Sequence, residues 1–167
     1  MKPYFAYWGK ARPEKGVGDP CHRLPFHALD VAACAQVLTE QSRFGIAELA
    51  GAMGWPVDAV QRLFIFFAAL HDIGKFACTF QKLVPELAPH RTVTSRRNPV
   101  EPLRHDTLGW LLWRDVGRQA WFGKELSLDA ADFGDVWMRL ATGHHGRPPK
   151  ENFGVFRTAK MGVSRAK

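Results

Sequence analysis

Residues 63–75, LFIFFAALHDIGK, are the stretch that decides the fold. Eight apolar residues run without interruption over positions 63–70, which predicts a helix buried on most of its sides. A histidine and a carboxylate, His71 and Asp72, follow at its end, and Gly74 is typical of a helix terminus. Burying an unpaired carboxylate is costly, and a divalent metal offsets that cost.

Two interpretations of His71-Asp72 are open. Neighbouring helical residues point about 100° apart, so both reach one site only near the helix end. A metal site there is the functional interpretation. In the structural alternative, Asp72 accepts capping or salt-bridge contacts, for example from Lys75, while His71 packs in the core.

Helical periodicity recurs along the rest of the chain. The predicted helices span residues 26–41, 46–53, 59–70, 106–119 and 128–142. The predicted core residues of the last two are Trp110, Leu111, Trp113, Val136, Trp137 and Leu140. No alternating strand pattern of useful length is present, so an all-α architecture is predicted.

Length and composition predict one compact domain. The 167 residues are 46% hydrophobic, enough to bury a core, and no domain boundary is evident within residues 1–167. The three cysteines form no Cys-x-x-Cys pair, which indicates intracellular thiols. No signal core or membrane-spanning apolar run is found, so we expect a soluble cytoplasmic protein without a membrane partner.

The net charge of +7 favours a polyanionic partner, because clustered cations release counterions from phosphates. Basic residues concentrate at Arg91, Arg96, Arg97 and Arg104 and in the tail from Arg147 onward. The alternative is a solvated surface and a loose terminus.

Further histidines extend the metal hypothesis. His144 and His145 lie between two glycines, which permits a tight turn around a ligand, although a polar loop is the alternative. His27 precedes Asp30 by three residues, so Asp30 either orients His27 or faces water. Imidazole and carboxylate donors suit Mn, Fe, Co, Ni or Zn better than Mg or Ca. No phosphate-binding Gly-x-x-x-x-Gly-Lys-Ser/Thr loop and no Gly-x-Ser-x-Gly elbow occurs, so metal-assisted hydrolysis remains.

Four motifs carry a family resemblance when taken in order. They are His27-x-x-Asp30, residues 70–75 (LHDIGK), Arg104-His105-Asp106 and Gly143-His144-His145-Gly146. The set resembles the HD superfamily of metal-dependent phosphohydrolases. Within this superfamily, residues 4–149 are most similar to the HD nuclease domain of the CRISPR-associated helicase-nuclease of type I systems, closest to type I-E. The segments that carry this narrower resemblance are 7–10 (YWGK), 26–33 (FHALDVAA), 69–76 (ALHDIGKF) and 80–81 (FQ).

The resemblance implies an all-α HD-domain helical bundle that cleaves single-stranded DNA exposed by an RNA-guided surveillance complex, together with a helicase domain or subunit. One metal would be held by His27, His71 and Asp72. A second would be held by His105, His144 and His145, with Asp72 as the bridge. Asp72 and Lys75 would be catalytic, with Lys75 stabilising the phosphate, and Arg96, Arg97, Arg104 and Arg147 would guide the strand.

One departure from the family pattern bears on activity. Members carry a further metal-binding Asp in a late helix that typically reads Ala-Asp-Trp, and no Asp follows His145 here. We therefore expect an HD domain that is incomplete at its C-terminus. The alternative function is a catalytically impaired HD fragment that binds the surveillance complex, DNA or the helicase-nuclease as a decoy or regulator. A third is an HD phosphohydrolase of nucleotides or small phosphate esters.

Overall fold

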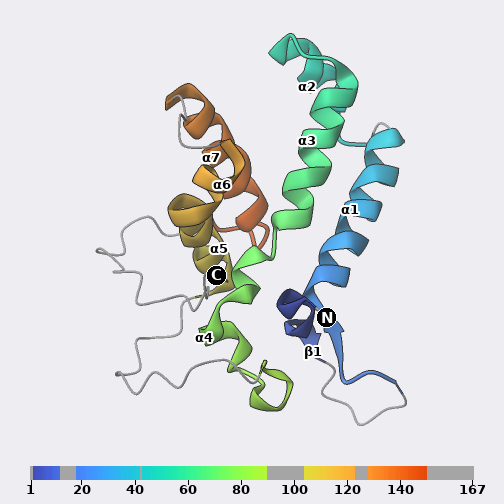
Figure 1. The fold of residues 1–167 in the computed structure, drawn as a ribbon. Helices are drawn as coiled ribbons and strands as arrows, with labels where there is room; N and C mark the ends of the chain where they lie inside the picture. Colours follow the sequence, from blue (N-terminus) through green and yellow to red (C-terminus); the bar gives the residue numbers. More distant parts are fainter. Residues whose placement is uncertain (1, 12–17, 42, 90–103, 123–127, 150–167) are drawn as a thin grey trace.

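The computed structural model describes residues 2–11, 18–41, 43–89, 104–122 and 128–149, and helices dominate it (Figure 1). The helices are α1 (Leu24–Glu40), α2 (Ile46–Met53), α3 (Val57–Leu70), α4 (Cys78–Gln81), α5 (His105–Leu112), α6 (Arg118–Phe122) and α7 (Leu128–Thr142). Short 3-10 turns are η1 (Pro3–Ala6), η2 (Ile73–Phe76) and η3 (Pro85–Leu87), and η4 (Trp113–Gly117) is a π-helical turn. The predicted all-α class is confirmed.

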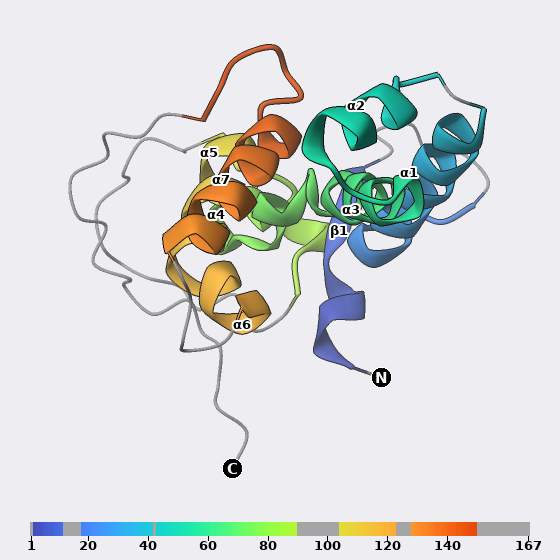
Figure 2. The same cartoon turned by 90° about the horizontal axis from the view of Figure 1, so that it is seen from above.

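The helix α3 is the central element. It packs against α1 and α2 on one side and α7 on the other, as Figure 2 shows from above. Predicted helices 46–53 and 128–142 coincide with α2 and α7, whereas α1 and α3 begin two residues before the prediction. Pro25 lies in the first turn of α1, where its missing N–H costs no hydrogen bond.

The predicted helix over 106–119 is helical throughout, but its helix type changes within the segment. α5 ends at Leu112, the π turn η4 follows, and α6 resumes at Arg118. Within this turn Trp113 enters the core, and its indole Nε1 donates to Asp135 Oδ1 of α7 at 3.0 Å. Trp113 makes this contact from a π-helical turn, and hydrophobic periodicity does not predict such a turn.

The structure also contains a small β-hairpin that the sequence analysis does not predict. β1 (Trp8–Ala11) and β2 (Cys21–Arg23) pair antiparallel, with an irregularity between Trp8 and Lys10. Strands this short show no measurable alternation. The buried Gln81 holds the first strand, since its side chain accepts from Trp8 N at 3.1 Å and donates to Trp8 O at 2.9 Å.

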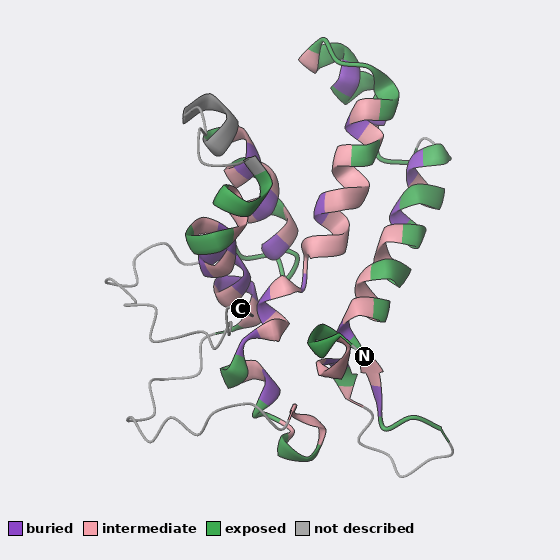
Figure 3. Cartoon of the chain, viewed as in Figure 1, coloured by how far each residue is buried: buried purple, intermediate pink, exposed green. Residues whose placement is uncertain are grey.

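Buried positions lie along most helices of the described residues (Figure 3), and some of the buried hydrophobic residues form two clusters. The upper cluster, between α2 and α3, consists of Ile46, Ala50 and Val60. The lower cluster, between α3, α5, η4 and α7, consists of Phe67, Trp110, Trp113 and Met138. Each cluster contains one of the two buried residues of α3. Within the run 63–70, which was predicted to be buried on most sides, Phe67 is buried and the other residues are half-buried, so the prediction holds in part.

Some predicted core residues are correct and some are not. Trp110, Leu111 and Trp113 are buried, and the half-buried Trp137 packs against the lower cluster. Val136 and Leu140 were predicted wrongly, since they are 58% and 68% exposed on the outer face of α7. Met138 and Thr142 occupy its inner face instead.

The helices of the described residues differ from membrane-spanning segments in length and hydropathy. No single helix is long and apolar enough to cross a bilayer; the bent pair Ile46–Met53 and Val57–Phe76 passes on length and composition only.

Gly74 determines how closely η2 approaches α5. A Cβ at this position would collide with the backbone of His105 and Gly109. The absence of a side chain therefore lets the two backbones touch, which a larger residue would prevent. This contact brings the segment that carries Asp72 against the first turn of α5.

Candidate metal centre

Asp72 lies at the centre of the site, in the turn between α3 and η2. The preceding residue, His71, still has helical backbone angles, whereas Asp72 leaves them (φ −105°, ψ 15°). This change of direction lets two adjacent side chains reach one site. Asp72 is buried, at 3% exposure, so its charge must be compensated by nearby groups.

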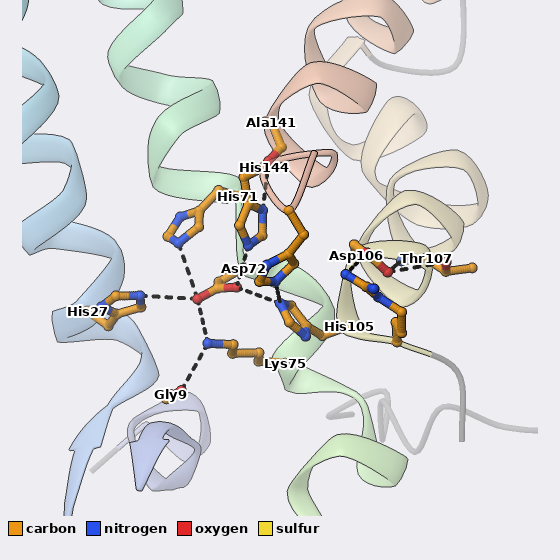
Figure 4. Close-up of polar contacts among 12 residues, drawn as sticks. Gly9, His27, His71, Asp72, Lys75, His105, Asp106, Thr107, Ala141 and His144 are labelled. Atoms are coloured by element: carbon orange, nitrogen blue, oxygen red, sulfur yellow. Dashed lines mark hydrogen bonds and ion pairs between the residues drawn. The ribbon is translucent and has the colours of Figure 1, made fainter. Parts of the chain in front are cut away.

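Two histidines and a lysine surround the Oδ2 atom of Asp72 (Figure 4). His27 Nε2, from the first turn of α1, lies 3.1 Å away, and His71 Nε2 lies 3.2 Å away. Lys75 Nζ, from η2, is closest at 2.6 Å. We call this set, Asp72 Oδ2 with His27, His71 and Lys75, the Oδ2 half.

Two other histidines face the Oδ1 atom, and a third lies beside one of them. His105 Nε2, from the start of α5, lies 3.3 Å from Oδ1, and His144 Nε2, from the turn after α7, lies 3.7 Å from it. His145 Nε2 lies 2.9 Å from His105 Nε2. We call Asp72 Oδ1 with these three histidines the Oδ1 half. The structure thus brings together all six residues that the sequence predicts as ligands.

Backbone carbonyls set the orientation of two imidazole rings. His71 Nδ1 donates to Ala68 O at 2.8 Å, and His144 Nδ1 donates to Ala141 O at 3.1 Å, because a carbonyl only accepts. In the neutral ring the proton is therefore on Nδ1, and each Nε2 carries a lone pair that is directed at Asp72. Such a second hydrogen bond is characteristic of metal-binding histidines.

The unpaired Oδ1 of Asp72 tests whether a metal fits this donor set. It is buried and has no hydrogen-bond partner among the described residues, although His105 and His144 lie nearby. A carboxylate oxygen and an imidazole lone pair that face one another repel unless a cation lies between them. Nitrogen and oxygen donors of this kind suit first-row transition ions, so the residues fit such a metal.

The pKa values of the cluster agree with this arrangement. Burial raises the pKa of Asp72, but its contacts with His105, His71 and Lys75 lower the pKa by more, so it lies far below its usual range. Burial lowers the pKa of His27 and of His144 below 6.5, which favours the neutral ring that binds metals.

Lys75 is held in place from several sides. Its Nζ donates to Gly9 O at 3.1 Å as well as pairing with Asp72, and it lies 5.6 Å from the centre of the Phe80 ring. Gln81 Nε2 donates to the Lys75 carbonyl at 2.7 Å. Gly9 and Gln81 belong to the segments YWGK and FQ that carry the family resemblance, but the sequence does not predict that they support Lys75.

Asp30 does not orient His27, contrary to one of the two interpretations. Its Oδ2 lies 2.8 Å from His22 Nε2, without the geometry of a hydrogen bond. His27 instead directs its Nε2 at Asp72. Asp30 remains largely exposed, as the other interpretation expects, while also contacting His22.

The predicted strand-guiding arginines are only partly described. Arg104 is exposed, immediately precedes His105, and forms an ion pair with Asp106 at 3.0 Å. Arg147 is exposed, two residues after His145 and beside Gly146, whose left-handed backbone (φ 76°) forms the turn. Arg96 and Arg97 lie outside the described residues, as does Arg91.

Comparisons with known proteins agree with the motifs. Residues 8–163 match the family described as "Cas3, HD domain". The CRISPR-associated endonuclease/helicase Cas3 of Escherichia coli (strain K12) is 29% identical over 162 residues, which is 84% of this chain. The aligned part is 17% of that longer protein. No solved structure matches the chain. The family match spans most of the chain and includes every residue of the cluster, so the chain belongs to the Cas3 HD domain family.

Proposed function

We propose that this domain is a metal-dependent nuclease that hydrolyses phosphodiester bonds of single-stranded DNA in CRISPR interference. The observation that carries the proposal is the buried Asp72, whose unpaired Oδ1 faces histidine nitrogens from two other elements. The family, and the name of the Escherichia coli relative, which describes an endonuclease and helicase, support a nuclease.

The bound metal, one or two ions of Mn, Ni, Co, Fe or Zn, would lower the pKa of a water and stabilise the attacking and leaving oxygens. The six predicted ligands would hold it, with Asp72 between the two halves. Asp72 keeps its negative charge at neutral pH because its pKa is far below the usual range. Lys75 supplies a fixed positive charge beside the site, suited to a phosphate oxygen.

The DNA strand would be guided by phosphate contacts, which carry little sequence preference. Arg104 and Arg147 flank the Oδ1 half in sequence and are exposed. Exposed aromatic rings can stack on bases: Trp55 and Trp121 are 44% and 56% exposed, whereas Trp8 is buried. The partners we propose are single-stranded DNA, a surveillance complex and a helicase domain or subunit, with the protein in the cytoplasm.

The experiment is cleavage of a labelled single-stranded oligonucleotide with Mn²⁺, Ni²⁺ or Co²⁺, comparing the wild type with Asp72→Asn. The substitution keeps the shape of the side chain and removes the charge that both halves share. We expect a loss of more than about 100-fold, since even outer partners of metal ligands contribute about 10- to 100-fold. Asp58→Asn, an exposed carboxylate on α3, is the matched control and should cleave normally.

Full cleavage by Asp72→Asn would contradict the proposal. The alternative role of a catalytically impaired fragment predicts binding of DNA or the surveillance complex without metal-stimulated cleavage by the wild type. Hydrolysis of a deoxynucleoside triphosphate in preference to the oligonucleotide would favour the small-phosphate-ester alternative.

A further inference from the structure

The two oxygens of Asp72 are already in different electrostatic environments. Oδ2 has an ammonium group at 2.6 Å, and Oδ1 has no hydrogen-bond partner among the described residues. A divalent ion added to the cluster therefore meets an oxygen paired with an ammonium group on one side and an oxygen that faces imidazole nitrogens on the other.

We propose that the two halves bind divalent metal unequally: the Oδ1 half takes the first ion, and Lys75 weakens binding in the Oδ2 half by occupying Asp72 Oδ2. This inference rests on the metal dependence of the proposed function and deepens it. It predicts which residues determine the affinity of the first ion, and it assigns Lys75 a role in metal stoichiometry.

The number and orientation of donors favour the Oδ1 half. It offers three imidazoles whose ring nitrogens lie close enough together to hold one first-row ion, and two of them, His105 and His144, also face Asp72 Oδ1. His144 is oriented for this role by its bond to Ala141 O. The Oδ2 half offers two imidazoles and an oxygen whose nearest partner is Lys75.

Lys75 is not easily displaced from Oδ2. Its ammonium group also donates to Gly9 O, and its carbonyl accepts from the buried Gln81. An ion bound through Oδ2 would lie close to this positive charge, and like charges at such a distance repel strongly where solvent screening is weak. Moving Lys75 away would leave the Gly9 carbonyl without this donor.

Accessibility favours the same half. His144 and His145 are exposed and His105 is half-buried, whereas His27, His71 and Lys75 of the Oδ2 half are all half-buried. The first ion can therefore enter the Oδ1 half without separating His27 of α1 from Asp72.

The test is calorimetric titration of the metal-free chain with CoCl₂, which measures binding without relying on activity. We expect the wild type to bind about one ion tightly and a second at least about tenfold more weakly. Lys75→Met should strengthen the second binding event by about tenfold or more, because it removes the competing charge while keeping the length of the side chain. Lys10→Met, an exposed cation of β1, is the matched control and should leave both events unchanged.

Paired ligand variants determine which half takes the first ion. His145→Gln should abolish the tight event, and His27→Gln should retain it. If Lys75→Met does not fold, as judged by circular dichroism, Lys75→Gln replaces it, since an amide still donates to Gly9 O.

Loss of the tight event in His27→Gln, equal affinity for two ions in the wild type, or no effect of the Lys75 variants would overturn the inference. Each of these outcomes leaves a metal-dependent nuclease possible. No cobalt binding by the wild type would overturn both proposals, whereas the expected titration without DNA cleavage would overturn the proposed function alone.

Discussion

The two hydrophobic clusters along α3 differ in what they support. The upper cluster, centred on Val60, joins α2 to α3 and contains no residue of the metal centre. The lower cluster, centred on Phe67, lies one helical turn before His71 and includes residues of α5 and α7, which lead to His105 and His144. Packing in the lower cluster therefore sets the positions of the metal-centre residues, whereas packing in the upper cluster contributes stability alone.

Truncating the two buried α3 side chains tests this difference most directly. Phe67→Ala should lower the free energy of unfolding by about 3–5 kcal/mol, and Val60→Ala by about 2 kcal/mol, because each leaves a cavity. Urea unfolding measures both values. Cobalt affinity of the folded protein should fall in Phe67→Ala and stay unchanged in Val60→Ala. An equal fall in both would contradict the inference that only the lower cluster positions the metal-centre residues.

A methyl group at Gly74 tests the contact between η2 and α5. Gly74→Ala should destabilise the protein by about 3 kcal/mol, the upper end for overpacking, because the added Cβ meets backbone atoms that cannot rotate away. The separation of α5 from η2 should also move His105 away from Asp72 and weaken cobalt binding. Gly51→Ala, on α2 where a Cβ meets nothing within 4 Å, is the control. Unchanged metal affinity in Gly74→Ala would show that this contact does not position His105.

Gln81 tests a support of the metal centre that belongs to neither cluster. Gln81→Leu should cost about 2 kcal/mol, because it leaves buried backbone groups of Trp8 and Lys75 without these partners. Gln36→Leu, an exposed glutamine of α1, should change stability by less than about 0.5 kcal/mol. Thermal and urea unfolding compare the two. Equal stability of both variants would contradict the structural role of Gln81.

The smallest expected effect is on pH dependence in the presence of EDTA. Burial lowers the pKa of His27 and of His144 in the folded state, so the unfolded state binds protons first as pH falls. The free energy of unfolding should therefore be constant above about pH 7 and decrease below about pH 6.5, toward the lower pKa values of the folded state. Asp72 does not contribute in this window because its pKa is far lower. His27→Gln should flatten the profile between pH 7 and 5, and an unchanged slope would exclude this origin.

Local sequence was enough for much of the architecture. Apolar spacing predicted α2 and α7 with their observed bounds and the type of α1 and α3, because amphipathic periodicity is a property of neighbouring residues. The motif residues also nominated six ligands that the structure brings together, and their binding of metal stays a prediction. Glycine and proline residues indicated where helices end.

Only the tertiary structure decided which atoms of these residues meet. The assignment of His27, His71 and Lys75 to one oxygen of Asp72, and of His105 and His144 to the other, depends on contacts between α1, α3, α5 and the turn after α7. The same holds for the support by Gln81 and for the exposure of Val136 and Leu140. Periodicity reports which face of a helix is apolar, but burial and pairing depend on partners distant in the chain, which the local pattern does not encode.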